Sequence, residues 1–539
     1  MLTGSALWRL NDPFNFRDAI TKNLEEGHAP MIIRRPVSGR VAILGAAGLL
    51  SLGLLQGPGQ ADGHLHLVAT DAFPPQAGWA METDDAYILA RAGCVESLTR
   101  RTADGALEPA LAESWTRHSP TEWDFTIRQG VTFSDGTPFD ATVAAEALNR
   151  MLSATAPPRA FAPKRIASVS AVDDMTVRIE SVNPSVLTPM RVSSPNTGFL
   201  APAAFAGDAV DPVGHCIGPF DIVEHVPQQA LMLKRHDAYW GGPAQLESGE
   251  MRFIPEGSGR ATQLRTGEAH VSARLPVTEV LGLQSEADVV VQTVAQARTN
   301  SLYLNNQKAP LDNMAVRQAI QSAIDSAAIA QAIYEGSAQA AVGPFGPNDP
   351  WAPEDAMAVS QDVERARALI AESGVDAESL NLVLYAYVER AELPDLAAVI
   401  QAQLGAIGIN VELKVANYGA LEPDLLSGEF DMLVLSRGYL SDVADPIGFL
   451  TADYTCEGGY NLSRFCDPDI DAMVDQASSA ESEAERYALY KDIARELQSR
   501  AVTVFLVHQQ GSDGHRSNVA NYAVHPDGHY LFTKDLALN

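Results

Sequence analysis

The sequence has 539 residues, which is enough for two or three domains with separate cores. Its formal net charge is −30, from 38 Lys and Arg against 68 Asp and Glu, so nucleic acid and anionic lipid are poor partners. Hydrophobic residues make up 46% and charged residues 20%, as in ordinary globular proteins, and the acidic surface by itself favours solubility.

The N-terminal region has the layout of an export signal. Basic residues Arg34, Arg35 and Arg40 precede the apolar stretch 41–55, and the small-residue sequence 59–61 follows it. We expect cleavage directly after this sequence, and a periplasmic location. An uncleaved anchor is the alternative, although the apolar stretch is short for a membrane span. No cysteine follows the stretch, which argues against a lipoprotein.

Residues 1–30 come before this signal and carry both acidic and basic side chains. Such a leader is unusual upstream of a basic signal start. We therefore expect translation to start at Met31, with 1–30 as a start-site extension and 31–61 as the signal peptide.

Four cysteines remain in the exported chain: Cys94, Cys216, Cys456 and Cys466. Export to an oxidising compartment favours disulfides. Cys456 and Cys466 flank a glycine-containing loop and are close enough in sequence to close it. Cys94 and Cys216 either pair or remain buried thiols.

The first half of the exported chain alternates short strands with helices. The predicted elements, in chain order, are a strand at 64–70, a helix at 83–99, a strand at 123–127, a tight turn at 135–138, a helix at 141–152 with Asp140 as its N-cap, and two strands within 166–179 around the turn 173–174.

The second half begins with one long predicted helix, 312–333, whose apolar residues fall on one face. Helices and strands then alternate, which predicts a mostly parallel sheet with helices on both faces. The predicted helices are 362–372, 395–407, 468–477 and 482–499, and the predicted strands are 380–385, 409–415, 430–435 and 502–507.

The stretch from Leu107 to Leu152 resembles the signature region of the extracellular solute-binding proteins, family 5, of peptide and nickel ABC importers. The residues that carry the resemblance are Leu111, Ala112, Glu113, Ser114, Trp115, Trp123, Phe125, Arg128, Gly130, Val131, Phe133, Asp135, Gly136, Pro138 and Ala141. A match of this density is specific.

The resemblance implies an α/β fold of two lobes joined by a hinge, as in class II-like, cluster C periplasmic binding proteins. The first lobe would comprise 62–297 and 508–539, with an extra β-rich subdomain at about 100–200, and the second lobe 298–507. The implied function is to capture a solute between closing lobes and deliver it to an ABC importer. Its partners would be the ligand and the permease subunits at the inner membrane, and we expect a monomer.

The family places ligand contacts after the first strand and after the signature helix. In the nickel branch, an arginine after that helix contacts the chelate, and Arg159 is preferred here over Arg150. The family usually has the sequence VGTGPF in the stretch 211–226, and His215 replaces part of that pattern here. The candidates from the first lobe are therefore Trp79, Glu82, Asp85, Arg159 and His215.

The richest candidate block is 436–466, which follows a predicted strand at the end where open α/β sheets bind ligands. In peptide-binding members an aspartate of the block W.ADY.DP holds the ligand's amino group. The matching stretch here has Asp442 and Asp445 but lacks the Trp, and either aspartate could instead cap a turn. The candidates from the second lobe are Tyr303, Asn305, Tyr385, Arg437, Tyr439, Asp442, Asp445, Tyr460 and Asn461.

Arg437 suits a ligand with an extra carboxylate, because a guanidinium binds a carboxylate bidentately. If it does so, Arg437→Ala weakens binding by about 1.5–3 kcal/mol. A surface ion pair is the alternative role for this residue. The cleft stretches and the cysteine loop resemble the branch for nickel or opine-metallophore chelates, with di- or oligopeptide binding as the alternative.

The sequence contains no enzyme motif of the zincin, P-loop, nucleophile-elbow or dinucleotide-binding types, so we expect no catalysis. Only His64 and His66 form a close histidine pair, so no direct metal ligands and no covalent cofactor are expected. A metal would arrive inside its own small-molecule chelator. A solute sensor or a periplasmic chaperone on the same fold is a further alternative, and a secreted enzyme is the least supported one.

Overall fold

The computed structural model describes residues 66–539, except 104, 208, 389, 391, 442 and the side chains of Arg159 and Glu378. The predicted export signal, the predicted start at Met31 and the candidate Asp442 lie outside the described residues. Within the described part, no helix is both long enough and apolar enough to cross a membrane.

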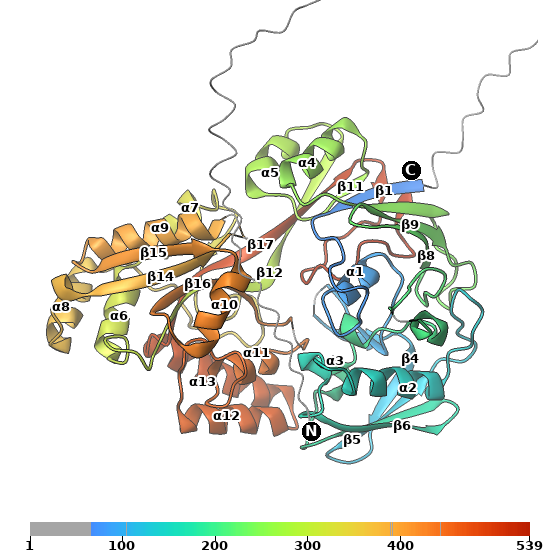
Figure 1. Ribbon diagram of the computed structural model, residues 1–539, viewed down its shortest axis with the longest axis horizontal. Coiled ribbons are helices and arrows are strands. Elements are labelled where there is room, and N and C mark those ends of the chain that lie inside the picture. Colours follow the sequence, from blue (N-terminus) through green and yellow to red (C-terminus); the bar gives the residue numbers. More distant parts are fainter. Residues whose placement is uncertain (1–65, 104, 208, 389, 391, 442) are drawn as a thin grey trace, which may run out of the picture. The chain divides into compact units, whose positions relative to one another are not determined.

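One sheet of eleven strands connects the two halves of the described chain, in the order β15-β14-β16-β12-β17-β11-β1-β10-β9-β8 with β13 paired to β17. The strands are β1 His66–Asp71, β8 Phe220–Val226, β9 Ala230–Arg235, β10 Ser248–Phe253, β11 Val271–Ser272, β12 Val289–Leu304, β13 Gln339–Ala340, β14 Asn381–Tyr387, β15 Asn410–Ala416, β16 Met432–Gly438 and β17 Thr503–Arg516. The long antiparallel strands β12 and β17 lie side by side at its centre (Figure 1).

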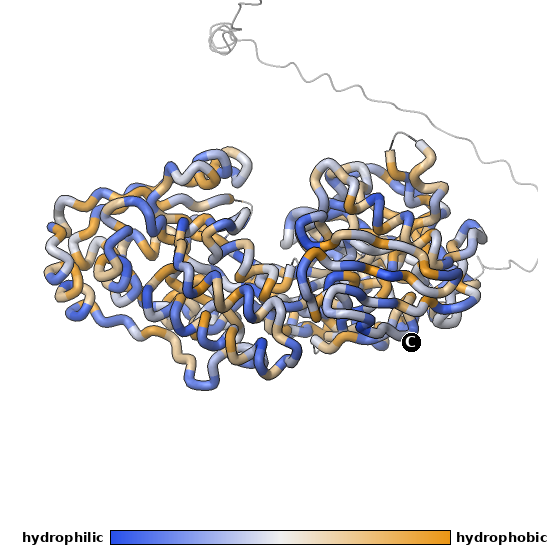
Figure 2. Tube along the Cα trace, turned by 90° about the horizontal axis from the view of Figure 1, so that it is seen from below, coloured by the Kyte–Doolittle hydropathy of each residue, from blue (hydrophilic) through white to orange (hydrophobic). Residues whose placement is uncertain are grey.

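Hydrophobic side chains gather into two large cores on either side of these central strands. The first core draws on residues from Leu67 to Ala273 and again from Val519 to Leu536. The second core draws on residues from Leu302 to Val507. Along the trace in Figure 2, hydrophobic and hydrophilic residues alternate, as strands and helices with one buried face require.

The signature region forms a separate four-stranded sheet in the order β4-β5-β7-β6. Its strands are β4 Ala112–Arg117, β5 Glu122–Ile127, β6 Ile166–Asp173 and β7 Thr176–Ser181, and the hairpin β2 Thr99–Arg101 with β3 Leu107–Pro109 precedes it. Helix α2, Ala141–Leu152, packs against β6 and β7 (Figure 1). The Asp140 carboxylate accepts the Val143 N–H at 2.9 Å, so the predicted helix and its cap are confirmed.

Two helix predictions were wrong because local polar and covalent demands interrupt the apolar pattern. The predicted helix 83–99 is only α1, Asp85–Arg91. Gly93 ends it with φ +70°, where a Cβ would lie 2.5 Å from the Phe532 carbonyl oxygen. The chain then runs on non-helically to the disulfide at Cys94.

The predicted helix 312–333 is divided into α6, Met314–Ala323, and α7, Ser326–Ala332. Between them Ile324 is extended, and the Asp325 carboxylate accepts the Ala328 N–H at 2.8 Å. An aspartate in this position caps a new helix instead of continuing the old one. The Asn313 side chain, one residue after the predicted start of the long helix, caps α6 by accepting the Ala315 N–H at 2.9 Å.

The remaining helices either pack on the sheets or form smaller cores of their own. They are α3 Thr188–Arg191, α4 Gly257–Thr266, α5 Val277–Gln284, α8 Val363–Ser373, α9 Glu392–Gly405, α10 Tyr418–Ser427, α11 Ile447–Tyr454, α12 Pro468–Ser479 and α13 Glu483–Ser499. The helices α11–α13 form one such smaller core, and the pair α4 and α5 forms another. Short 3-10 turns lie at Arg159–Phe161, Pro195–Thr197, Pro202–Phe205 and Ala377–Ser379, and β18 Val519–Ala520 pairs with β19 Ala537–Leu538.

The expected parallel arrangement applies to only part of the second half. Strand β14 is parallel to β15 and β16, whereas β12 is antiparallel to both β16 and β17. Strand β17 also extends to Arg516, beyond the apolar run at 502–507 from which it was predicted. Its polar second part is a strand because it pairs with β12 and β11, a pairing that local hydrophobicity does not reveal.

Both cysteine pairs form disulfides. Cys456–Cys466, separated by 10 residues, confirms the predicted loop closure. Cys94–Cys216, separated by 122 residues, decides the alternative that the sequence left open. Its sulfur atoms lie in the first core beside Ile217 and Phe220.

A buried histidine lies where β12, β13 and β17 meet. The His508 Nε2 accepts the Val342 N–H at 3.1 Å, and its Nδ1 lies 3.1 Å from the Thr299 hydroxyl. Burial lowers the pKa of His508 from 6.5 to about 4. The ring is therefore neutral in the folded protein at pH 6, whereas it takes up a proton on unfolding.

We expect His508 to make the protein less stable as the pH falls from 6.5 to 4, because the unfolded chain then binds more protons than the folded one. Over this window the loss approaches about 3 kcal/mol. Urea unfolding at pH 7 and pH 4.5 measures it, with His508→Gln as the comparison, because the amide still accepts a hydrogen bond but does not titrate. An equal pH dependence in both proteins would remove His508 as the cause.

Candidate functional site

Arginines gather around the crossing of β12 and β17. Arg298, on β12, donates from Nη1 to the Ser436 carbonyl oxygen at 3.0 Å. Burial, followed by the charges of Arg390, Arg437 and Arg274, lowers the pKa of Arg298 to about 9. Within the described residues, no carboxylate lies within 4.0 Å of its guanidinium.

Arg390 follows the carboxyl end of β14, three residues after Tyr387. Its side chain is half-buried, and no ion pair or side-chain hydrogen bond joins it to another described residue. Its charge lowers the pKa of both Arg298 and Arg274, so the three guanidinium groups share one region. The carboxyl ends of strands are where open α/β sheets bind ligands.

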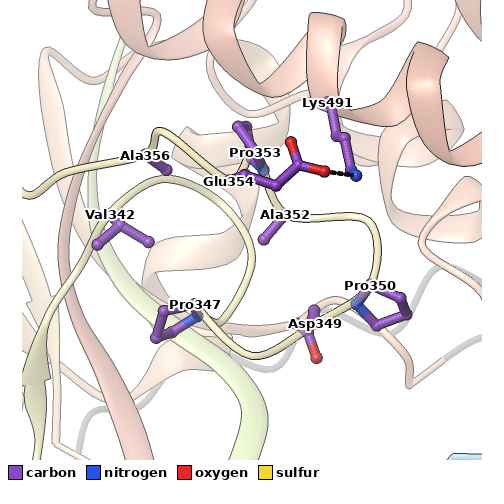
Figure 3. Close-up of a pocket in the computed structure, with 9 residues that line it drawn as sticks. All are labelled: Val342, Pro347, Asp349, Pro350, Ala352, Pro353, Glu354, Ala356 and Lys491. Carbon is purple, nitrogen blue, oxygen red and sulfur yellow. Dashed lines mark hydrogen bonds and ion pairs between the residues drawn. The ribbon is translucent and has the colours of Figure 1, made fainter.

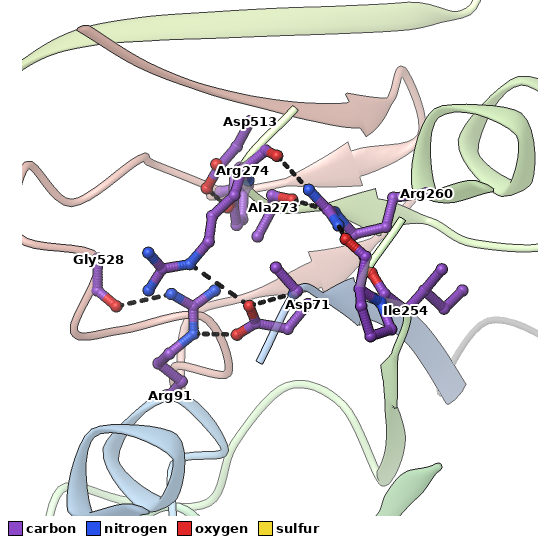
Figure 4. A network of polar contacts seen from close by, with 11 residues as sticks. Asp71, Arg91, Ile254, Arg260, Ala273, Arg274, Asp513 and Gly528 are labelled. Carbon is purple, nitrogen blue, oxygen red and sulfur yellow. Dashed lines mark hydrogen bonds and ion pairs between the residues drawn. The ribbon is translucent and has the colours of Figure 1, made fainter. Parts of the chain in front are cut away.

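A buried aspartate holds the third of these arginines (Figure 4). The Asp71 carboxylate, at the end of β1, pairs with Arg91 Nε at 2.5 Å and with Arg274 Nε at 3.4 Å. Although burial raises the pKa of Asp71, the two guanidinium groups bring it below its usual value. Arg274 also lies 4.9 Å from the ring centre of Phe73, whose side chain is 55% exposed.

Among the described residues of this region, positive charge exceeds negative charge. The arginines are Arg91, Arg274, Arg298, Arg390 and Arg437, and the carboxylates on them or beside them are Asp71, Asp453, Asp513 and Glu392. In a chain of net charge −30, an excess of buried or half-buried cations costs desolvation energy unless an anion binds there. The region is therefore suited to a carboxylate-bearing ligand.

Arg437 is already paired. Its Nη2 and Nε atoms donate to the Asp453 carboxylate at 2.8 and 3.0 Å, and its guanidinium lies 5.1 Å from the ring centre of Tyr460. Asp453 is fully buried and also accepts the Tyr303 hydroxyl at 3.3 Å. The structure thus brings together three predicted site residues, Arg437, Tyr303 and Tyr460. They gather around Asp453, a carboxylate of the protein itself, and not around a ligand carboxylate.

Five other predicted residues of the second half make hydrogen bonds that hold the fold together. Asp445 is buried between Arg486 and Tyr490 and accepts the first N–H of α11. Asn461 and Asn305 each donate to two backbone carbonyls, those of Thr455 and Phe465 and those of Gly428 and Phe430. The Tyr439 hydroxyl donates to Asp349, and the Tyr385 hydroxyl contacts Asp424.

Among the predicted residues of the first half, Asp85 holds the backbone. Its carboxylate accepts the N–H groups of Gln76, Ala77 and Trp79 at 2.8–2.9 Å, which fixes the loop after β1. Trp79 is 5% exposed and lies at φ +66° against His225. Glu82, nearby, is half-buried.

The two other candidates lie in or next to the signature region. His215 Nδ1 lies 3.4 Å from a carboxylate oxygen of Asp135, in the signature turn. Arg159 begins a 3-10 turn, and its side chain lies outside the description. Within α1, the Tyr87 hydroxyl donates to the Ser441 carbonyl at 3.0 Å and so connects α1 to the segment after β16.

A pocket of about 290 Å³ lies between the loop 342–356 and α13 (Figure 3). Prolines and alanines form most of its wall, and the Lys491 ammonium is paired with Glu354. It therefore offers an anion no unpaired cation, in contrast to the region of Arg298 and Arg390.

Comparisons with known proteins identify the family of this chain. The profile of the bacterial extracellular solute-binding proteins, family 5 (middle region), matches residues 106–461, about two thirds of the chain. The chain belongs to this family. The family consists of solute-binding proteins rather than enzymes.

Two relatives of this family 5 protein are named for different kinds of ligand. A probable di/tripeptide-binding protein 5 of Pseudomonas aeruginosa is 28% identical over 466 residues, covering 80% of this chain and 87% of the relative. The nickel-binding protein NikA of Staphylococcus aureus is 25% identical over 454 residues, covering 84% and 89%. The crystal structure of that NikA with Ni(L-His)2 superposes with a TM-score of 0.74 at 22% identity, over 88% of this chain and all of the other. The family 5 protein therefore has the two-lobe α/β fold that its sequence predicted.

Sequence reasoning missed Arg274, Arg298 and Arg390. A signal for Arg390 existed, because it follows a predicted strand in an α/β alternation, at the end where ligands bind. Arg298 lies on the strand that crosses between the halves, where the sequence pattern indicated only a connection.

Proposed function

We propose that this protein captures a carboxylate-bearing solute around Arg298 and Arg390 and delivers it to the permease of an ABC importer. The solute is peptide-like or a metal chelate. The single observation that carries the proposal is this pair of guanidinium groups, for which the described residues provide no carboxylate within 4.0 Å, where β12 and β17 cross between the proposed lobes. The apolar ring of Phe73 beside Arg274 supports a ligand with an apolar part as well.

The lobes of this proposal are 62–297 with 508–539, and 298–507. The chain passes between them in β12 and β17, whose pairing is irregular between Ala295 and Thr299 and again at Asn300. Such an irregularity at the crossing supports a hinge there, as in periplasmic binding proteins that close on their ligands. A single copy of the chain, after cleavage of the signal peptide, is sufficient for the two lobes to close on a ligand.

A metal chelate and a peptide remain distinct candidates. More than one unpaired arginine suits a chelate with several carboxylates, whereas a dipeptide has a single terminal carboxylate and needs an anion for its amino group. The nickel-binding and peptide-binding relatives support one candidate each. The family resemblance and the location in the periplasm agree with either.

Native mass spectrometry of the protein purified from its own periplasm, with metal analysis, separates these candidates. A released chelator together with a metal supports the chelate, and a di- or tripeptide without metal supports the peptide. The released solute then serves as the titrant for the next experiment.

Arg390→Ala is expected to weaken binding of this solute by about 1.5–3 kcal/mol, or roughly 10- to 150-fold, because a charge-assisted hydrogen bond in a partly desolvated site is lost. Isothermal titration calorimetry measures the change. Arg390→Lys keeps the charge but not the bidentate geometry. Its affinity for the solute should therefore lie between those of the wild type and Arg390→Ala.

The matched control is Arg367→Ala, since Arg367 lies exposed on α8 and pairs with Glu364. Its affinity should equal that of the wild type. If Arg390→Ala binds as tightly as Arg367→Ala, the solute is held elsewhere and the proposed site is wrong.

A further inference from the structure

Three potential metal ligands lie together in the segment His525-Pro526-Asp527-Gly528-His529, between β18 and β19. One donor atom from each of His525, Asp527 and His529 lies within 4.8 Å of the other two. Within the described residues, this is the one group of three or more His, Cys, Asp or Glu residues with such a spacing. The sequence pattern showed both histidines but gave no reason to pair them.

A tight turn holds the two imidazoles on the same side. The Gly528 N–H donates to the His525 carbonyl at 2.8 Å, and Gly528 has φ +65°. Arg91 Nη1 donates to the Gly528 carbonyl at 2.9 Å and so anchors the turn to the Asp71 network (Figure 4). A Cβ at position 528 would lie 3.3 Å from that Nη1 atom. The result is two nearly parallel imidazoles, 5.4 Å apart and 15° between their planes.

The environment encloses both imidazoles, and His525 is only 7% exposed. The Nδ1 atom of His529 is buried and has no hydrogen-bond partner. Tyr87 and Tyr530 pack against the two imidazoles and limit the access of water.

Arg101 lies beside these ligands and pairs with one of them. Its Nη1 pairs with a carboxylate oxygen of Asp527, and both side chains are 11% exposed. The His525 Nε2 lies 3.3 Å from the Arg101 carbonyl oxygen, a long contact. The Nε atom of Arg101 is itself buried without a hydrogen-bond partner. The guanidinium thus neutralises Asp527 but leaves two buried polar atoms unsatisfied, its own Nε and His529 Nδ1.

We propose that His525, Asp527 and His529 bind a divalent transition-metal ion directly, with Arg101 as the internal cation that the metal displaces. Two imidazoles and one carboxylate suit Zn²⁺, Ni²⁺ or Cu²⁺ better than Mg²⁺ or Ca²⁺. Ligand atoms around a tetrahedral zinc ion lie about 3.3 Å apart, so the three donors must move closer together as Arg101 leaves. Three protein ligands leave a coordination position for water or another small molecule.

The site lies at a small pocket that both lobes line. Arg101, Asp527, His529 and the two serines 193 and 194 face Leu440, Ser441, Val443 and Ala444 from the segment after β16. The pocket has a volume of about 10 Å³, so a metal bound here has room for a water molecule as a further ligand. This proposal does not depend on the solute proposed for Arg298 and Arg390.

The test uses the untagged, exported form of the protein. A chelator first removes any bound metal, and dialysis then removes the chelator. Titration with NiCl₂ and with ZnCl₂ alone, followed by calorimetry, should show one ion bound per chain. His529→Ala should weaken binding at least tenfold. Arg101→Gln should tighten it, by several-fold or more, because a competing cation and its repulsion are removed.

The tightening by Arg101→Gln is the decisive readout, since a merely structural role of the segment would not produce it. His118→Ala, at an exposed histidine of the signature sheet, is the matched control and should bind as the wild type does. Asp527→Asn provides a second loss variant, and circular dichroism checks that each variant is folded. Absence of binding in both the wild type and Arg101→Gln, or equal affinity in His529→Ala, would overturn the proposal. No organic solute is present, so either result leaves the Arg390 experiment unaffected.

Discussion

Arg437→Ala is expected to lower the free energy of unfolding by about 3–5 kcal/mol, since it leaves the Asp453 carboxylate buried without its counter-ion. Asp453 is completely buried, and Arg437 meets it with two nitrogen atoms. The Tyr303 hydroxyl, at 3.3 Å, is a neutral donor and compensates for only part of the lost guanidinium. The main effect should therefore appear in stability.

Urea unfolding of the ligand-free protein measures this effect, and Arg367→Ala serves again as the exposed-arginine control, with an expected change below about 1 kcal/mol. The double variant Arg437→Met with Asp453→Leu should recover much of the loss, because removing both charges avoids a buried unpaired one. An unchanged stability of Arg437→Ala with a loss of solute affinity beyond tenfold would instead return Arg437 to the ligand contacts that its sequence position predicted.

Removal of the Cys94–Cys216 disulfide, by replacing both cysteines with alanine, is expected to cost about 5 kcal/mol, because a loop of this length loses much entropy on closure in the unfolded chain. The bridge closes 122 residues, from the end of α1 across the whole signature region. By the same relation, the 10-residue bridge Cys456–Cys466 should contribute about 3 kcal/mol.

Unfolding of the two double-alanine variants in guanidinium chloride, under identical conditions, compares these contributions. The order should be wild type, then the variant lacking Cys456–Cys466, then the variant lacking Cys94–Cys216. The reverse order would mean that packing of the removed sulfur atoms, and not loop entropy, determines the stabilisation.

The structure changes the role of several side chains that the sequence offered for a ligand. Asp445, Asn305 and Asn461 have the residue types that a binding site needs, but the same types cap helices and satisfy backbone groups. Local sequence does not distinguish these uses, because Asn305 donates to a carbonyl 125 residues away and Asp445 pairs with Arg486, 41 residues away. Asp442, the other aspartate of that block, stays a prediction.

The sequence by itself determined the family, the signature sheet with its capped helix, and the disulfide loop 456–466. In these parts the deciding interactions are local: the alternation of β5, the Asp140 cap and the short cysteine spacing.

Only the tertiary structure decided where charge remains uncompensated. Arg437 is the arginine that the sequence predicted for a ligand carboxylate, but Asp453 neutralises it. Arg298 and Arg390 come together from positions 92 residues apart, and no described carboxylate pairs with either of them. It also brought Arg101 onto Asp527 between two histidines. Whether an ion is paired depends on distances of a few ångströms between remote segments, and these distances arise only when the chain has folded.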